Sequence, residues 1–334
     1  MANIRIPKGW EIQSSLATPE TIHANRRQIL RGMGFLGLGA LLGKPVLAGC
    51  MQQDQEQEPP PFEKRAPEGV FPAKRNEKFE LDRKITPEGI AGRYNNFYEF
   101  TTDKARVWKL AQNFETRPWE VKVSGLVHKP QTFDIDDLLK KMPQEERLYR
   151  FRCVEAWAMA VPWTGFSLKA LLDRVEPKSQ AKYVKLTTFL RPEQAPGQKA
   201  QPWYDWPYVE GLRMDEAMNE LTLLATGIYG HELPPQHGAP IRLITPWKYG
   251  FKSAKSIVSI ELVEERPKTF WNESQPKEYG FFANVTPGHP HPRWSQMTER
   301  LISTGERVDT KPFNGYGEYV AKLYEGMDKS VWGF

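Results

Sequence analysis

The 334-residue sequence has only two cysteines, Cys50 and Cys153. Two cysteines cannot build the disulfide framework that stabilises many small secreted domains. The sequence also has no Cys-x-x-Cys-His motif and no cluster of cysteines, so we expect neither haem nor an iron–sulfur cluster in this chain. If the protein is a redox enzyme, it has one centre and exchanges electrons with a separate protein.

Glycine-rich phosphate loops and membrane-spanning runs are missing as well. Without a Gly-x-Gly-x-x-Gly or Walker motif, a phosphate-bearing cofactor would be held by scattered side chains and backbone amides. The apolar run from Gly32 to Gly43 has twelve residues, too few to span a bilayer, and no other stretch is long and apolar enough.

A basic surface is also missing from most of the chain. Residues 1–49 hold six of the 46 basic side chains and two of the 41 acidic ones, which leaves 40 basic and 39 acidic side chains elsewhere. The basic excess therefore belongs to the first 49 residues, and nucleic acid is not expected as a partner.

The first 90 residues predict an export signal and a tether. Asn25-Arg26-Arg27-Gln28-Ile29-Leu30-Arg31 is a twin-arginine pattern, so residues 1–49 are predicted to direct export of the folded protein to the periplasm. Leu47-Ala48-Gly49-Cys50 resembles a lipobox, in which Cys50 would be lipidated and anchor the protein to a membrane. Lys44-Pro45 interrupts the run before it, and cleavage by an ordinary signal peptidase is the alternative. Residues 50–90, rich in Pro, Gln and Glu, are predicted to form an extended tether.

Residues 91–334 predict one α+β domain in which short strands mix with a few helices. No internal repeat and no break in composition divides this region. Helices are predicted over 134–141, with Asp134 near the N-cap, and over 168–175. Strands are predicted over 119–125, 147–153, 183–189, 221–229, 241–245 and 257–263.

Cys153 is the one cysteine of this predicted domain. It follows an alternating run from Arg147 to Arg152, so we expect it at the end of a strand where a loop begins. The guanidinium groups of Arg150 and Arg152 are expected to ease ionisation of its thiol. The residues alone leave three interpretations: a buried inert thiol, which is the commonest fate of a lone cysteine, a nucleophile, or the ligand of a soft metal.

Several longer motifs in this domain resemble the sulfite-oxidase-fold molybdoenzymes, and in particular the catalytic subunits of periplasmic methionine sulfoxide reductases. The motifs are Tyr94-Asn-Asn-Phe-Tyr-Glu-Phe100, Arg152-Cys-Val-Glu-Ala-Trp157, Val209-Glu-Gly-Leu-Arg213, Pro234-Pro-Gln-His-Gly-Ala-Pro-Ile-Arg242 and Pro246-Trp-Lys-Tyr-Gly-Phe-Lys252. The resemblance runs from about Tyr94 to Trp294 and implies the sulfite oxidase fold, with one molybdenum–molybdopterin per chain. It also implies that Cys153 coordinates the molybdenum, and thiolates do suit soft redox metals.

The same resemblance implies the residues that contact the cofactor. These are Asn95, Tyr98, Glu99, Thr188, His237, Arg242, Ser253, Ala254 and Lys255. Arg242 and Lys255 suit the cofactor's phosphate, although without the surrounding motifs they would be interpreted as solubilising charges at strand edges. His237 departs from the family pattern, which has Asn there, but either side chain can donate a hydrogen bond. His289-Pro-His291 is interpreted as a loop and not as a metal site.

The resemblance implies oxygen-atom transfer from methionine sulfoxide in oxidised periplasmic proteins. A haem-containing membrane partner would supply the electrons from the quinone pool. Sulfite oxidation, or reduction of other small S- or N-oxides, is the alternative on the same fold. Sulfite is an anion and favours a cationic pocket, whereas Cys153 is followed by Glu155 and Trp157. Glu155 is expected to shape the charge of the pocket, or to be structural.

Tryptophan is abundant near the motifs, and two further classes of function remain open. An aromatic rim for a methionine side chain, or simply core, is expected from Trp163, Trp203, Trp206, Trp247 and Trp294. One further class is a lipid-anchored binding protein with an inert Cys153. The other is a cysteine-nucleophile hydrolase, which needs a histidine base beside the thiol.

Overall fold

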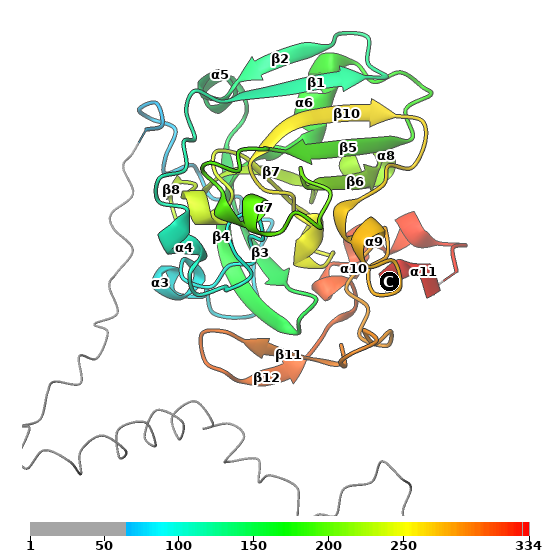
Figure 1. Ribbon diagram of the computed structural model, residues 1–334. Helices are drawn as coiled ribbons and strands as arrows, with labels where there is room; N and C mark the ends of the chain where they lie inside the picture. The colour runs from blue at the N-terminus through cyan, green and yellow to red at the C-terminus, as the bar shows by residue number, and fades with distance from the viewer. Residues whose placement is uncertain (1–64, 329, 334) are drawn as a thin grey trace, which may run out of the picture. The chain divides into compact units, whose positions relative to one another are not determined.

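The computed structural model describes residues 65–328 and 330–333 (Figure 1). Its strands are β1 (Glu120–Gly125), β2 (Gln131–Asp134), β3 (Glu145–Arg152), β4 (Trp157–Ser167), β5 (Tyr183–Thr188), β6 (Val209–Arg213), β7 (Leu223–Ile228), β8 (His231–Glu232), β9 (Arg242–Ile244), β10 (Ile257–Val263), β11 (Thr298–Leu301) and β12 (Arg307–Asp309). Its α-helices are α3 (Glu88–Ala91), α4 (Val107–Leu110), α5 (Ile135–Lys141), α6 (Leu168–Val175), α7 (Pro196–Ala200), α8 (Met214–Ala217), α9 (Phe270–Ser274), α10 (Gly317–Val320) and α11 (Ser330–Gly333). Short 3₁₀ turns are η1 (Pro235–His237), η2 (Gly250–Lys252), η3 (Pro312–Gly315) and η4 (Ala321–Tyr324). Every strand and helix predicted from the sequence is present, with bounds that differ by at most about two residues.

Two sheets organise the described chain, which is α+β as predicted. The first has the order β2-β1-β10-β5-β6, and in it β1 and β10 are parallel while the other neighbours are antiparallel. The second has the order β12-β11-β4-β7-β8, with β3 added beside β4 and β9 beside β7. In Figure 1 the first sheet lies at the top, and β11 and β12 lie at the bottom.

The first sheet and two capped helices enclose one apolar core. Val121 and Val123 alternate with exposed residues along β1 and are fully buried. The Asp134 side chain accepts hydrogen bonds from the backbone of Asp136 and Asp137, which begins α5 as its predicted N-cap. Ser167 caps α6 in the same way, and the helix buries one apolar face, comprising Leu168, Leu171, Leu172 and Val175.

The second sheet is built around β4, which the sequence did not predict. Its 11 residues are buried along almost the whole strand because neighbours cover both faces, so the sequence from Trp157 to Ser167 shows no alternation. β3 pairs with β4 in antiparallel register, from Glu145 opposite Gly165 to Arg152 opposite Ala158. The turn of this hairpin contains Cys153, at the strand end where the sequence placed it.

Residues 65–90 correct the predicted tether over 50–90, because this part packs on the domain. Phe79 is 5% exposed, and the Asn76 backbone NH donates to the Glu146 carbonyl at 2.8 Å. The buried carboxylate of Glu232 accepts the backbone NH groups of Arg65 and Ala66, at 2.9 and 2.8 Å. These residues thus obtain their ordering contacts from the second sheet. The rest of the predicted tether, the export signal over 1–49 and Cys50 lie outside the described residues.

No helix within the described residues is both long and apolar enough to cross a bilayer.

Candidate active site

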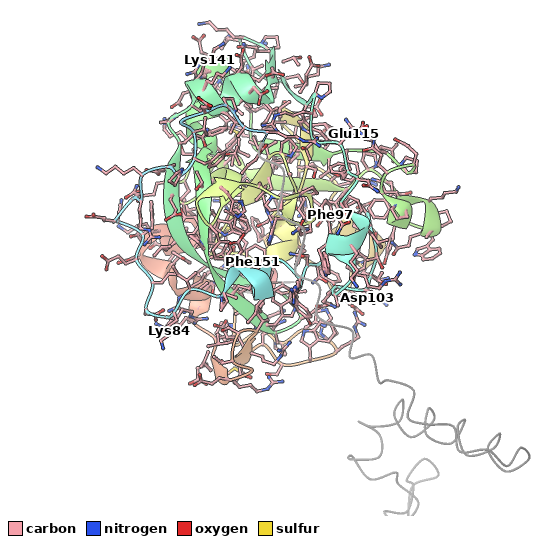
Figure 2. All side chains as sticks on the ribbon, turned by 90° about the vertical axis from the view of Figure 1, so that its left-hand side faces the viewer. Lys84, Phe97, Asp103, Glu115, Lys141 and Phe151 are labelled. Atoms are coloured by element: carbon pink, nitrogen blue, oxygen red, sulfur yellow. The ribbon has the colours of Figure 1, made fainter. Side chains whose placement is uncertain are left out.

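A cleft with about 850 Å³ of empty space, part of it open to solvent, lies beside Cys153. Side chains of the second sheet, of the segment after α3 and of the loops that precede β6 and β10 line it. Figure 2 shows Phe151, one of these lining residues, nearer the middle of the molecule than Lys84 and Lys141. The cleft contains eight of the predicted site residues: Cys153, Glu155, Asn95, Tyr98, Glu99, His237, Arg242 and Lys255.

The hairpin turn between β3 and β4 fixes the position of Cys153. The Cys153 NH donates to the Trp157 carbonyl at 2.9 Å, and the Ala156 NH donates to the Cys153 carbonyl at 3.1 Å. Ala156 has a φ of 61°, in the left-handed region. From the far side, the Trp294 indole and the Gln296 amide both donate to the Val154 carbonyl, at 2.8 and 2.7 Å. A turn held on both sides presents the thiol in one orientation.

Burial outweighs the effect of the two arginines on the Cys153 thiol, which corrects the prediction from the sequence. Arg152 is fully buried, pairs with the Glu299 carboxylate at 3.1 Å and donates to the Cys153 carbonyl. Arg150 pairs with Asp82. Burial raises the pKa of the Cys153 thiol to about 12, and the nearby Glu155 carboxylate adds to this effect. The thiol is therefore protonated at neutral pH unless a metal ion displaces its proton.

The surroundings of the Cys153 sulfur argue against a hydrolase. Its hydrogen-bond partners are Asn96, whose Nδ2 donates to Sγ at 3.3 Å, and Glu155, whose backbone NH donates to Sγ at 3.4 Å. No histidine is among the partners of this thiol in the described structure, so the base that a nucleophilic cysteine requires is missing. Asn96 was not among the predicted site residues, although it lies within one of the quoted motifs.

Glu155 faces the same side of the cleft as the thiol. Its Oε2 lies 3.9 Å from Cys153 Sγ, and it accepts hydrogen bonds from the Trp157 indole at 3.1 Å and from Asn96 Nδ2 at 3.3 Å. Lys104 completes the group with an ion pair to the same oxygen at 3.2 Å. Three donors, one of them the cationic Lys104, therefore surround this carboxylate beside the sulfur. No local pattern in the sequence indicates Lys104.

Arg242 marks a cationic end of the cleft. It is 3% exposed, and its NH1 and NH2 groups donate to the carbonyls of His237 and Ser253 at 2.7 and 3.4 Å. Its Nε is buried without a hydrogen-bond partner. The guanidinium also lies over the Trp163 ring, 4.9 Å from the centroid. Burial without a carboxylate partner lowers the pKa of Arg242 to about 9. A bound anion would stabilise this buried guanidinium charge.

Lys255 adds a second charge to this end. Its Nζ lies 5.0 Å from the centroid of Phe97 and forms no ion pair with any described carboxylate. Burial lowers the pKa of Lys255 and raises that of Glu99, which faces it across a longer distance. Gly238 has a φ of 95°, and a Cβ there would meet the Lys255 Cβ at 2.5 Å, so glycine permits the lysine to approach.

His237 is neutral in this setting. Burial lowers its pKa to about 3, and the Arg242 charge adds to this effect. Asn95 Nδ2 lies 3.5 Å from His237 Nδ1 and donates to the Ala91 carbonyl at 3.2 Å. In either tautomer the His237 ring adds polar atoms to the cleft but no charge.

The cleft fits the cofactor that the sequence implied. Two cations without carboxylate partners suit a phosphate, and buried polar atoms without hydrogen-bond partners suit a ligand with many donors and acceptors. Besides Arg242 Nε, the latter are Asn95 Oδ1, Asn96 Oδ1 and Trp163 Nε1, all on residues that line the cleft. Cys153 would hold the molybdenum, and Arg242 and Lys255 would hold the phosphate.

Three predicted contacts do not line the cleft. Thr188 ends β5 and is 1% exposed, while Ser253 and Ala254 follow η2 and are equally buried. The carbonyls of Ser253 and Ala254 accept from Arg242 and from the backbone of Leu243. Ser253 and Ala254 therefore support Arg242 and β9 from outside the cleft lining.

The expected aromatic rim is only partly present. Of the five tryptophans named from the sequence, Trp163 lines the cleft, and the indole of Trp294 is used to hold the turn. The rings that do line the cleft and were not predicted are Tyr94, Phe151, Tyr208, Phe251, Trp271 and Tyr279. They come from separate segments, so no local pattern joins them.

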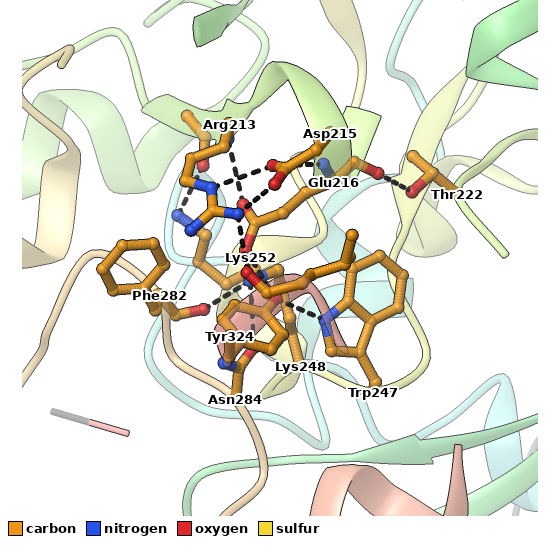
Figure 3. A network of polar contacts seen from close by, with 12 residues as sticks. Arg213, Asp215, Glu216, Thr222, Trp247, Lys248, Lys252, Phe282, Asn284 and Tyr324 are labelled. Atoms are coloured by element: carbon orange, nitrogen blue, oxygen red, sulfur yellow. Dashed lines mark hydrogen bonds and ion pairs between the residues drawn. The ribbon is translucent and has the colours of Figure 1, made fainter. Parts of the chain in front are cut away.

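The two lysines of the motif from Pro246 to Lys252 are structural. Lys248 is fully buried; its Nζ donates to Glu216 at 2.6 Å and to the Phe282 carbonyl at 2.8 Å (Figure 3). Figure 3 also shows the Tyr324 hydroxyl beside Glu216, to which it donates at 2.6 Å. Lys252 pairs with the buried Glu210 at 2.5 Å. The contacts of Lys248 and Glu216 with Tyr324 attach the C-terminal segment to the domain, and neither lysine lines the cleft.

Comparison with known proteins agrees with this geometry. The family model described as "Oxidoreductase molybdopterin binding domain" matches residues 109–271. A protein of Xanthomonas axonopodis pv. citri named "Protein-methionine-sulfoxide reductase catalytic subunit MsrP" is 49% identical over 96% of this chain and 97% of its own length. The chain belongs to the MsrP family. Relatives with the same name are 50% identical in Xanthomonas campestris pv. campestris and 49% identical in Burkholderia mallei, each over 96% of this chain and 97% and 95% of their own lengths.

Membership of the MsrP family confirms the resemblance that the motifs predicted, and the molybdopterin-binding domain confirms the cofactor class and the enzyme class. Among solved structures, the sulfane dehydrogenase SoxCD from Paracoccus pantotrophus matches with a TM-score of 0.43 at 17% identity. That match covers 55% of this chain and 47% of the other.

Proposed function

We propose that this protein reduces methionine sulfoxide in oxidised periplasmic proteins to methionine. The observation that carries the proposal is the pairing, in one cleft, of a fixed Cys153 thiol with a buried Arg242 that has no carboxylate partner, in a chain about half identical to proteins named for this activity. When bound, the molybdenum–molybdopterin group supplies the two-electron chemistry by which a sulfoxide, two protons and two electrons become a thioether and water.

The chain's own residues bind the cofactor and orient the substrate. Cys153 holds the metal by one thiolate from a turn that is braced on both sides. Arg242 and Lys255 hold the phosphate end, and neutral His237 adds hydrogen bonding without further charge. The aromatic lining of the cleft, which includes Trp271, excludes water and contacts the apolar thioether.

Glu155 favours a neutral substrate over sulfite. Its carboxylate is held 3.9 Å from the Cys153 sulfur, inside the cleft. An anion placed there meets a like charge, and Lys104 only partly offsets it. A sulfoxide carries a dipole but no net charge, so it does not meet this repulsion.

The cell compartment and the electron donor complete the proposal. The twin-arginine pattern supports export of the folded, cofactor-loaded chain to the periplasm, and Cys50 is proposed as a lipid anchor. Electrons would arrive from the quinone pool through a haem-containing membrane subunit, MsrQ. Metabolic labelling with palmitate tests the anchor, and a Cys50→Ala variant that keeps the label would refute it.

The activity is tested with the purified, cofactor-loaded protein and a reduced viologen dye as electron donor. Dye oxidation that depends on methionine sulfoxide, with methionine as product, is the expected result. Sulfite oxidation with an oxidised dye is measured in parallel. A protein that oxidises sulfite rapidly and ignores methionine sulfoxide would refute the proposal.

A further inference from the structure

A continuous run of aromatic rings leads from the cleft to the surface. Trp271, on α9, lines the cleft and packs edge-on against Tyr98, 5.1 Å between centroids. Tyr204 lies 5.9 Å from Trp271, and Trp203 lies 6.1 Å from Tyr204. Trp203 is 70% exposed, the highest value among the large apolar side chains of the described residues.

The loop that carries Trp203 is tied to the cleft wall. Gln201 Nε2 donates to the Tyr98 carbonyl at 2.9 Å, and the Trp206 indole donates to the Gln201 carbonyl at 3.1 Å. The preceding helix approaches so closely that a Cβ on Gly197 would meet the Tyr98 carbonyl oxygen at 2.2 Å. The loop therefore presents Trp203 to solvent at a set place relative to the cleft.

Exposure alone does not argue for a binding surface, because single exposed apolar residues are common. Trp203 differs in two respects: its ring continues a packed row that ends inside the cleft, and its backbone is fixed. Aromatic side chains placed in this way dominate binding at protein interfaces, since they bring large area at low cost in conformational entropy.

We propose that Trp203 and Tyr204 form a docking surface for the stretch of polypeptide that flanks the methionine sulfoxide of a protein substrate. The inference rests on the proposed function and adds where the substrate chain lies. From Trp271 to Trp203 the ring centroids span at most about 12 Å, which an extended chain covers in about four residues. A substrate chain whose backbone passes Trp271 thus reaches Trp203 about four residues further along.

The test compares substrates of different length with the cofactor-loaded enzyme and a viologen donor. One substrate is free methionine sulfoxide, one is a tripeptide with the sulfoxide in the centre, and one is an eleven-residue peptide with five residues on each side. For Trp203→Ala we expect KM for the long peptide to rise about tenfold, the size of one interface anchor, with kcat unchanged. KM for the two short substrates should stay within about twofold of wild type. Trp203→Phe should restore most of the loss.

Ile85→Ala is the matched control, because Ile85 is another exposed apolar residue, 37% exposed, outside the cleft lining. It should leave all three KM values unchanged. The inference is overturned if Trp203→Ala changes KM for the three substrates equally or leaves all three KM values unchanged. It is also overturned if the variant keeps its peptide KM but takes electrons more slowly from membranes, or loses self-association, which would assign the surface to the electron donor or to a second copy. A wild-type enzyme that reduces none of the three substrates refutes the proposed function itself.

Discussion

The variant Arg242→Met tests whether Arg242 binds the cofactor or only stabilises the fold. The chain offers a matched control, because Arg152 is equally buried but has a carboxylate partner, Glu299, at 3.1 Å. Arg242 has only two carbonyls and an unpartnered Nε. If Arg242 serves the cofactor's phosphate, its removal should harm cofactor retention and spare the fold, whereas Arg152→Met should destabilise the fold.

The magnitudes follow from the two environments. For Arg242, the difference between a pKa of about 9 and the ordinary 12.5 corresponds to roughly 5 kcal/mol of unfavourable burial in the cofactor-free chain. Removing the side chain relieves that cost, but it leaves two carbonyls unpaired and abolishes the cation–π interaction with Trp163, which together cost roughly 3–5 kcal/mol. The free energy of unfolding should therefore change by less than about 2 kcal/mol. Arg152→Met breaks a buried pair and should cost roughly 3–5 kcal/mol.

The assay has two parts. Urea unfolding of cofactor-free protein, expressed in cells that cannot make molybdopterin, gives the change in stability. Pterin and molybdenum content of protein expressed in ordinary cells gives retention, which should fall roughly tenfold to a hundredfold in Arg242→Met through the loss of charge-assisted hydrogen bonds. Wild-type pterin content in Arg242→Met, or a loss of stability as large as that of Arg152→Met, would refute the reasoning.

Three further predictions concern the cleft. Cys153→Ser should leave a folded chain without turnover and without bound molybdenum, and unchanged activity would exclude the ligand role. His237 has a folded pKa of about 3 against an ordinary 6.5, so its burial stabilises the cofactor-free protein above pH 6.5, and this stability is lost as the pH falls toward 3. Between pH 7 and pH 5 the loss is about 2 kcal/mol, and urea titrations of His237→Asn should lack that part of the pH dependence; identical pH profiles would contradict it. Glu155→Gln removes the charge beside the sulfur and should lower the inhibition constant of sulfite roughly tenfold, and an unchanged constant would show that this carboxylate does not select against anions.

The sequence predicted those parts of the fold that have a local pattern. Alternation identified β1 and β5, and the capping residue Asp134 together with the apolar face of α6 identified the helices. β4 was not predicted because it is buried on both faces, and a continuous apolar run does not distinguish a strand from other buried segments. The packing of residues 65–90 on the domain was not predicted because their partners, such as Glu232 and Glu146, lie far away in the sequence.

The site was predictable as a set of residues but not as an environment. The resemblance named eight residues that the fold brings into one cleft. The two arginines before Cys153 implied the wrong direction for the ionisation of its thiol, because burial outweighs the charge of Arg152. Lys104, the partner of Glu155, and the aromatic row to Trp203 arise from tertiary contacts alone.

The most direct measurement is the molybdenum content of the exported, mature protein, determined by elemental analysis together with its methionine sulfoxide reductase activity. The account predicts about one molybdenum atom per chain in the wild type and almost none in Cys153→Ser. A fully active preparation that contains no molybdenum would contradict it.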